Sequence, residues 1–179
     1  MRIFTIGALV ALLGCVTAIA APPVTKGVYG GVIRVGRGAA GATLGMTRAQ
    51  VIAHLGRPLK GNGLVMSYEN LPLGKISPKT PHGIFDLYLR KGRVRMIVIS
   101  PHSGWHLPDG SHVFGHGVIA HLMKLYGPRL KPKRIEDGER LYRITERYLG
   151  RTVWTEFYVE RFGANASVSG FDMLFPLSG

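Results

Sequence analysis

The chain has 179 residues, with 23 Lys and Arg against 10 Asp and Glu, so its formal charge is +13. An apolar content of 46% excludes a wholly disordered chain, and the 25 glycines follow no three-residue repeat, which excludes collagen. A single cysteine excludes both a disulfide scaffold and a zinc site built from several cysteines.

The first 20 residues have the pattern of a secretory signal peptide. Arg2 supplies the positive start, the apolar stretch Ile3–Gly14 carries no charge, and Ala18 and Ala20 form a small-x-small cleavage site. The alternative is a membrane anchor, since the uncharged stretch is long enough to span a bilayer. We expect export to the periplasm or beyond the cell, with cleavage after Ala20 and no later membrane-spanning segment.

A second alternative for the N-terminus involves the single cysteine. Leu12–Cys15 resembles the lipobox of bacterial lipoproteins, in which the cysteine carries lipid and becomes the first residue. The chain would then be an outer-membrane lipoprotein anchored through Cys15.

Residues 21–40 are predicted to form an N-terminal arm. Val32–Val35 is a short β-like run and gives the arm one weak strand. Gly36–Gly41 is rich in glycine and is predicted to be a flexible connection.

The clearest local pattern predicts a helix over Thr47–Leu55. Thr47 is a good N-cap, and Gln50 three residues later completes a capping box. Gly56 suits the position after the helix, and Pro58 prevents continuation. At under three turns, this helix must be held by packing.

Strand patterns follow, and then the helix sequence recurs. Val118–Leu122 is identical to Val51–Leu55, and the second helix is expected to continue to Tyr126. We therefore predict two tandem units, residues 41–100 and 101–179, that share one core. Each unit packs a short helix on an antiparallel sheet, which gives an α+β fold. The predicted strands are Leu64–Tyr68, Ile84–Leu89, Val94–Ile99, Arg140–Tyr148, Thr152–Val159 and Val168–Leu174, with a surface loop over Leu71–His82.

The core is predicted from the apolar faces of these elements. We expect twelve side chains to be buried together: Val51, Ile52, Leu55, Val118, Ile119, Leu122, Tyr126, Phe85, Leu87, Ile97, Trp154 and Phe157.

The stretch Gly45–Pro58, which reads GMTRAQV and then LGRP, resembles the opening of small exported bacterial domains of the SmpA/OmlA group and of the related β-lactamase-inhibitor-protein-like (BLIP-like) fold. Trp105–Gly110 and Leu125–Gly127 resemble the second unit of tandem versions. The resemblance implies a helix on an antiparallel sheet, repeated. SmpA/OmlA members are outer-membrane lipoproteins that support barrel assembly, and other members of the fold bind and inhibit enzymes. The matching residues are structural, so they imply a fold more than a function.

Histidines suggest metal chemistry as an alternative function. His102, His106, His112, His116 and His121 lie close in sequence, and neutral imidazole is a common metal ligand. Their spacing does not match a metal-binding helix, because His116 and His121 are five residues apart rather than four. We expect no metal site and no cofactor, and keep a metal-binding protein or metal-dependent enzyme as the alternative.

The usual catalytic arrangements are weak in this sequence. Ser100, Ser103 and Ser111 lie near histidines, but no Gly-x-Ser-x-Gly turn accompanies them. Paired carboxylates are also weak candidates, because Glu136, Asp137 and Glu139 lie among basic residues, as in a solvated turn. We therefore expect no enzymatic activity and name no catalytic residue.

Basic residues point to an anionic partner. Arg93 and Arg95 lie two apart on a predicted strand and should share a face, and Lys131, Lys133 and Arg134 form a second basic group. Export argues against nucleic acid and favours an anionic lipid or lipopolysaccharide surface, or an acidic envelope protein. The leading hypothesis is a non-catalytic envelope protein that acts as a binding or assembly module. An inhibitor of an extracellular enzyme is a further alternative, by analogy of fold.

Overall fold

The computed structural model describes residues 28, 30–68, 85–100, 104–135, 139–163 and 165–176. Within these residues the protein is a sheet-dominated α+β fold with two α-helices, α1 (Arg48–Leu55) and α2 (Val118–Tyr126). A 3₁₀ turn, η1 (Gly127–Arg129), directly follows α2. The loop predicted over residues 71–82 lies outside the described residues.

The strands of the described residues form a large sheet and a small one. The large sheet has the order β10-β11-β12-β13-β7-β6-β5-β4, with β9 paired to β13 beside this path, and all of its neighbours are antiparallel. The small sheet has the order β3-β2-β1-β8. The strands are β1 (Gly31–Arg34), β2 (Gly38–Ala39), β3 (Ala42–Thr43), β4 (Lys60–Gly61), β5 (Val65–Ser67), β6 (Phe85–Arg90), β7 (Arg93–Ile99), β8 (Trp105–His106), β9 (Gly115–His116), β10 (Leu130–Arg134), β11 (Arg140–Tyr148), β12 (Arg151–Val159) and β13 (Ser167–Leu174).

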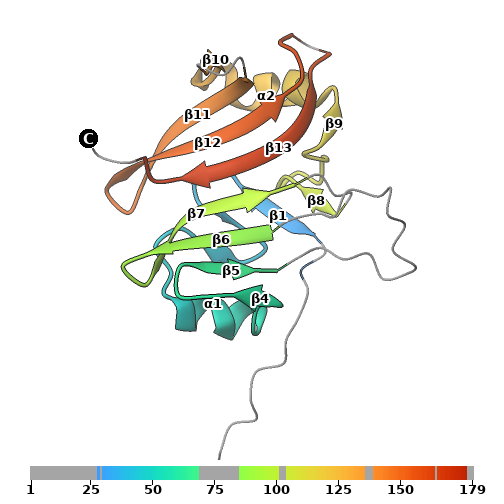
Figure 1. The fold of residues 1–179 in the computed structure, drawn as a ribbon. Helices are drawn as coiled ribbons and strands as arrows, with labels where there is room; N and C mark the ends of the chain where they lie inside the picture. Colours follow the sequence, from blue (N-terminus) through green and yellow to red (C-terminus); the bar gives the residue numbers. More distant parts are fainter. Residues whose placement is uncertain are drawn as a thin grey trace, which may run out of the picture.

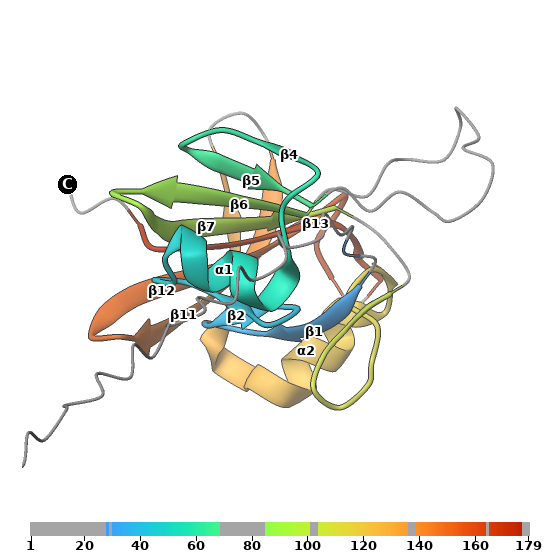
Figure 2. The ribbon, with the colours of Figure 1, turned by 90° about the horizontal axis from the view of Figure 1, so that it is seen from below.

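The large sheet is covered on one face. Figures 1 and 2 show both helices and the small sheet on the same side of it. One apolar core fills the space between these layers, and it includes Ile33 of β1, Val51 of α1, Leu122 of α2, and Leu87 and Phe157 of the large sheet. None of the helices in the described part of the chain combines the length and the apolar character needed to cross a membrane.

Pairing between β7 and β13 joins the two halves of the large sheet. Ile99 lies opposite Phe171, and Ile97 lies opposite Met173. On one side of this pairing, α1 is followed in sequence by β4–β7. On the other side, α2 is followed by β10–β13.

Helix α1 begins as the sequence predicts. The Thr47 hydroxyl accepts a hydrogen bond from the backbone N–H of Gln50 at 3.3 Å, and the Gln50 side chain accepts one from the N–H of Thr47 at 2.8 Å. This confirms the capping box. At the other end, the Tyr68 hydroxyl donates to the carbonyl of Gly56 at 2.7 Å, which ties the helix to the end of β5.

The structure corrects two expectations about local segments. Gly36–Gly41 was predicted to be a flexible connection, but it contains β2, whose two residues are buried. Gly38 packs so tightly that an added Cβ would lie 2.0 Å from the carbonyl oxygen of Ala42. In addition, β10 was not predicted, because Pro132 lies in its middle and proline is compatible with a strand mainly at a sheet edge.

The predicted core is buried except at three positions. Ile52, Tyr126 and Trp154 are only half-buried. Trp154 was expected inside, but it lies opposite Thr145 and Leu174 on the uncovered face of the large sheet. In β12 the outward positions carry the aromatic residues Trp154 and Tyr158, while the polar Thr155 is buried, so the sequence shows no clean apolar–polar alternation that would have separated the two faces.

The uncovered face carries a row of charged residues across the sheet. Asp172 of β13 lies opposite Glu156 of β12, and both are nearly buried. The Tyr158 hydroxyl donates to Asp172 Oδ2 at 3.1 Å. Burial raises the pKa of Asp172 to about 6, with a further contribution from the charge of Glu156.

This shift predicts a pH-dependent effect of Asp172→Asn on stability. In the unfolded chain the carboxyl of Asp172 ionises near pH 4, whereas in the folded protein it ionises near pH 6. Between these pH values, ionisation stabilises only the unfolded state. The wild-type protein therefore loses stability as pH rises through this range. Asp172→Asn should raise the free energy of unfolding by about 3 kcal/mol at pH 7 and change it little at pH 4.

Urea unfolding of both proteins at the two pH values measures this effect. Asp109→Asn is the control of opposite sign, because hydrogen bonds from Ser111 lower the pKa of Asp109 to about 2. A stability gain from Asp172→Asn that is equal at both pH values would contradict the assignment.

Candidate functional site: two basic pockets

The first basic pocket lies at the turn between β6 and β7 and has a volume of about 340 Å³. We call it the hairpin pocket. Figure 1 shows the β6–β7 turn and the β11–β12 turn at the same end of the large sheet. The described residues that line it include five cations and no carboxylate: Gly45, Arg90, Lys91, Arg93, Val94, Arg95, Arg151 and Phe175.

The segment before α1 positions Arg93 in this pocket. The N–H of Gly45 donates to the carbonyl of Val94, and the N–H of Val94 donates to the carbonyl of Met46, both at 2.8 Å. Arg93 Nη1 donates to the carbonyl of Gly45 at 3.0 Å. Gly45 has a φ of +87°, and an added Cβ would lie 2.8 Å from a methyl carbon of Leu149. Only glycine therefore fits at this position without displacement.

A β-bulge positions Arg95. Leu89 of β6 lies opposite Val94, and the preceding residue Tyr88 lies opposite Met96, so Arg95 is an extra residue in β7. A bulge bends its strand and re-aims the side chain of the extra residue. The carbonyl of Arg95 accepts a hydrogen bond from the N–H of Phe175 at 3.1 Å, which holds the bulge against the end of β13.

The electrostatics of the hairpin pocket are unfavourable without a ligand. Arg95 is half-buried, and its Nη2 is buried with no hydrogen-bond partner among the described residues. Burial lowers the pKa of Arg95, and repulsion from Arg90 and Arg151 lowers it further. The guanidinium of Arg151 lies 4.1 Å from the ring centroid of the buried Phe175. The pocket thus concentrates positive charge against an apolar wall.

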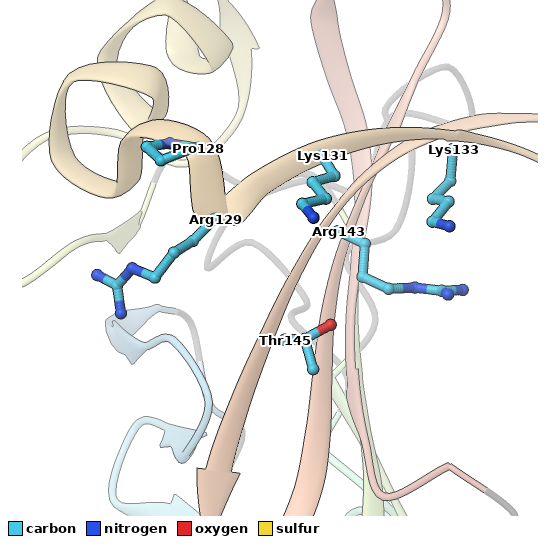
Figure 3. Close-up of a pocket in the computed structure, with 6 residues that line it drawn as sticks. All are labelled: Pro128, Arg129, Lys131, Lys133, Arg143 and Thr145. Carbon is cyan, nitrogen blue, oxygen red and sulfur yellow. The ribbon is translucent and has the colours of Figure 1, made fainter.

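The second basic pocket lies beside the edge strand β10 and has a volume of about 440 Å³. We call it the edge pocket, and Figure 3 shows its lining. Lys131 lies opposite Arg143 of β11, so the two side chains share a face, and Lys133 shares it by alternation. The lining residues are Pro128, Arg129, Lys131, Lys133, Arg143 and Thr145.

Both arginines of the edge pocket already have acidic partners. Arg143 donates through Nε to Glu156 Oε1 at 2.7 Å, and its guanidinium stacks 3.9 Å from the ring centroid of Trp154. Arg129 pairs with Glu146 at 3.1 Å. The two lysines lie on an edge strand, where lysine and proline prevent pairing with other chains. Edge protection therefore accounts for Lys131 and Lys133 without any ligand.

The structure brings some of the predicted anion-binding residues together and separates one. Arg93 and Arg95 line one pocket, although the bulge interrupts the alternation on which their prediction relied. Lys131 and Lys133 line the other. Arg134 alternates to the opposite face of β10, where its guanidinium lies 5.9 Å from the ring centroid of Phe162.

Sequence reasoning did not assign Arg90, Arg143 or Arg151 to a site. Arg90 lies opposite Arg93 across the hairpin, and its position beside the predicted turn could have indicated that it belongs to the same site. Arg151 begins β12, far away in the sequence. It reaches the hairpin pocket only because β13 lies between β12 and β7.

The described histidines do not converge on a metal site. His121 Nε2 lies 2.7 Å from Asp109 Oδ2, and His106 Nδ1 lies 3.3 Å from the carbonyl of Gly104. His116 is exposed on β9, and His102 lies outside the described residues. Within the described residues no group of three or more His, Cys, Asp or Glu side chains is placed to hold a metal ion.

Ser111 is bound to an acid rather than to an imidazole. Its hydroxyl donates to Asp109 Oδ1 at 2.7 Å, while His121 contacts the other oxygen of the same carboxylate. Asp109 therefore anchors the loop before α2 to the helix. In this arrangement no imidazole takes the proton of the Ser111 hydroxyl, as a nucleophilic serine requires. Ser103, Glu136 and Asp137 lie outside the described residues.

Comparison of the chain with protein-family models, curated proteins and solved structures finds no match. The function must therefore be inferred from the two pockets themselves.

The pairing of Arg143 predicts that this residue serves the fold more than it serves a ligand. Arg143→Met leaves the carboxylate of Glu156 nearly buried without its partner and should cost about 3 kcal/mol of unfolding free energy. Lys131→Met, on the neighbouring strand, should change stability by no more than about 0.5 kcal/mol. Urea unfolding measures both. Equal effects of the two substitutions would show that the Arg143–Glu156 pair is not structural.

Proposed function

We propose that this chain is an exported, non-catalytic envelope protein that binds an anionic lipid surface. The observation that carries the proposal is the hairpin pocket, where five cations line one cavity and no carboxylate lines it among the described residues. Clustered cations act together on an anionic surface, whereas scattered ones are screened separately.

The N-terminal pattern supports export. Residues 1–20 combine a positive start, an apolar run and a small-residue cleavage site. We propose a periplasmic or secreted protein with cleavage after Ala20, and a lipoprotein anchored through Cys15 as the alternative. In an exported protein, a basic surface meets lipid head groups rather than nucleic acid.

We further propose that the fold consists of two tandem units. The identical sequences Val51–Leu55 and Val118–Leu122 lie in α1 and α2. Each helix precedes four antiparallel strands of the large sheet, and the two sets meet at β7 and β13. This arrangement supports a duplication and agrees with the BLIP-like resemblance of Gly45–Pro58.

Binding to vesicles tests the proposed function. Each cation near an anionic membrane contributes about 1 kcal/mol, so the double substitution Arg93→Ala and Arg95→Ala should weaken binding to phosphatidylglycerol vesicles by about tenfold or more. Binding should also weaken as salt rises, because screening acts over about 8 Å at physiological ionic strength. Vesicle sedimentation at low and high salt measures both effects.

A matched control removes the same charge elsewhere. Arg57 and Arg161 are exposed and lie outside both pockets, so Arg57→Ala with Arg161→Ala should weaken binding less. The double substitution Lys131→Ala and Lys133→Ala measures how much the edge pocket contributes to vesicle binding. The proposal would be overturned if vesicle binding changed neither with salt nor with the substitutions in the two pockets.

Intact-mass measurement of protein from its native host tests export. A chain that begins at Ala21 is expected. A lipid-modified chain that begins at Cys15 would support the lipoprotein alternative, and an unprocessed chain that begins at Met1 would contradict export through either route.

A further inference from the structure

We propose that the hairpin pocket is a discrete site for a phosphomonoester dianion, bound by a cluster of five cations that no carboxylate of the described lining compensates. This inference rests on the proposed function and deepens it, because it names the chemical group that the pocket recognises.

The unpaired donor is the first argument. Arg95 Nη2 is buried, so water does not satisfy it, and no protein acceptor among the described residues does so. An unsatisfied buried donor is unusual in a folded protein and is costly for a charged group. In a fully solvated basic turn, every N–H group of the guanidinium would reach solvent, including those on Nη2. Because Arg95 nevertheless lines the pocket, an anion bound there would offset the charge of this poorly solvated guanidinium.

The cluster of like charges is the second argument. Arg90 and Arg151 repel Arg95, and the described residues of the lining include no acid to compensate them. Hydrogen bonds nevertheless hold the side chain of Arg93 and the backbone of Arg95 in place. Arg93 is tied to the carbonyl of Gly45, and the bulge at Arg95 is tied to Phe175. An arrangement that is rigid and repulsive on its own becomes favourable when an anion of high charge lies between the cations.

The donor chemistry selects the class of anion. Arginine guanidinium groups present planar forks that match phosphate oxygens. A terminal phosphate carries about −1.5 to −2 charges and three acceptor oxygens, enough to engage several arginines at once. A carboxylate carries one charge and two oxygens in a plane. A phosphodiester carries one charge and has two of its oxygens blocked.

The walls of the pocket strengthen this selection. Val94 is 1% exposed and Phe175 is 3% exposed, so part of the lining is apolar. Charge–charge attraction is stronger where protein replaces water. The edge pocket differs in its charges, since its arginines already pair with Glu146 and Glu156.

Calorimetric titration of the protein with inorganic phosphate at pH 8 tests the site. At matched ionic strength, phosphate should bind at least about tenfold more tightly than acetate or dimethyl phosphate, because only phosphate offers two charges and three oxygens. Equal affinity for the three anions would overturn the proposal.

Arg95→Met tests the residue itself, with Arg57→Met as the control that removes the same charge from an exposed site. Arg95→Met should weaken phosphate binding by at least about tenfold, and Arg57→Met should leave it nearly unchanged. Without phosphate, Arg95→Met should unfold at the same temperature as wild type or higher, because an unpaired, repelled guanidinium is gone. Phosphate should raise the unfolding temperature of the wild-type protein but not that of Arg95→Met. A structural role for Arg95 would instead lower the unfolding temperature in the absence of phosphate, and that result would overturn the proposal.

Vesicles identify the source of the phosphate group. Phosphatidic acid presents a phosphomonoester and phosphatidylglycerol a phosphodiester. If the ligand is a lipid head group, vesicles of phosphatidic acid should retain more protein than phosphatidylglycerol vesicles of equal surface charge, and glycerol phosphate should compete. If the ligand is a soluble phosphomonoester, phosphate binds without this preference, and the site is still supported.

The two proposals fail in different ways. Phosphate binding without attachment to any vesicle would overturn the proposed function and support the site. Salt-dependent vesicle binding without phosphate selectivity would support the function and overturn the site.

Discussion

The antiparallel pairing of β7 with β13 is the contact on which the rest of the structure depends. Ile97, Ile99, Phe171 and Met173 meet across it and are almost completely buried, and the ring of Phe171 packs 5.3 Å from that of Phe157. Without this pairing, each set of four strands would end in an open edge, and the core would divide. The same pairing brings Phe175 to the carbonyl of Arg95 and places Arg151 near the β6–β7 hairpin. The contact that closes the sheet therefore also builds the hairpin pocket.

Local sequence patterns were enough to predict the two helices and the long strands. The caps at Thr47 and Gly56 specify α1, and apolar periodicity specifies α2 and the long strands. Strands β4, β8 and β9 have two residues each, too few for any periodicity to show. They exist because a neighbouring strand offers hydrogen bonds. Trp154 was assigned to the wrong face because β12 carries aromatic residues on its outward side and the buried Thr155 on its inward side, so apolar character does not separate its faces.

The candidate site was predictable only in part for the same reason. The spacing of Arg93 and Arg95 suggested a shared surface, and both line one pocket. The bulge that positions Arg95 has no recognisable pattern in the sequence, and Arg151 belongs to a strand that is distant in the sequence. The motif around Gly45 indicated a helix start. The carbonyl of Gly45 also accepts the hydrogen bond that holds Arg93, and this second role depends on backbone pairing between the segment before α1 and β7.

The two tryptophans of the chain occupy contrasting surroundings. Trp105 is fully buried, with its ring 5.1 Å from that of Phe85, and its indole N–H finds no hydrogen-bond acceptor in the described part of the chain. Trp154 lies half-exposed on the uncovered face of the sheet beneath the guanidinium of Arg143. The chain therefore contains two fluorophores that report on different events without any label. A water-soluble quencher should reach Trp154 and spare Trp105, so emission at short wavelength follows the integrity of the core, while emission at long wavelength follows occupancy of the uncovered face.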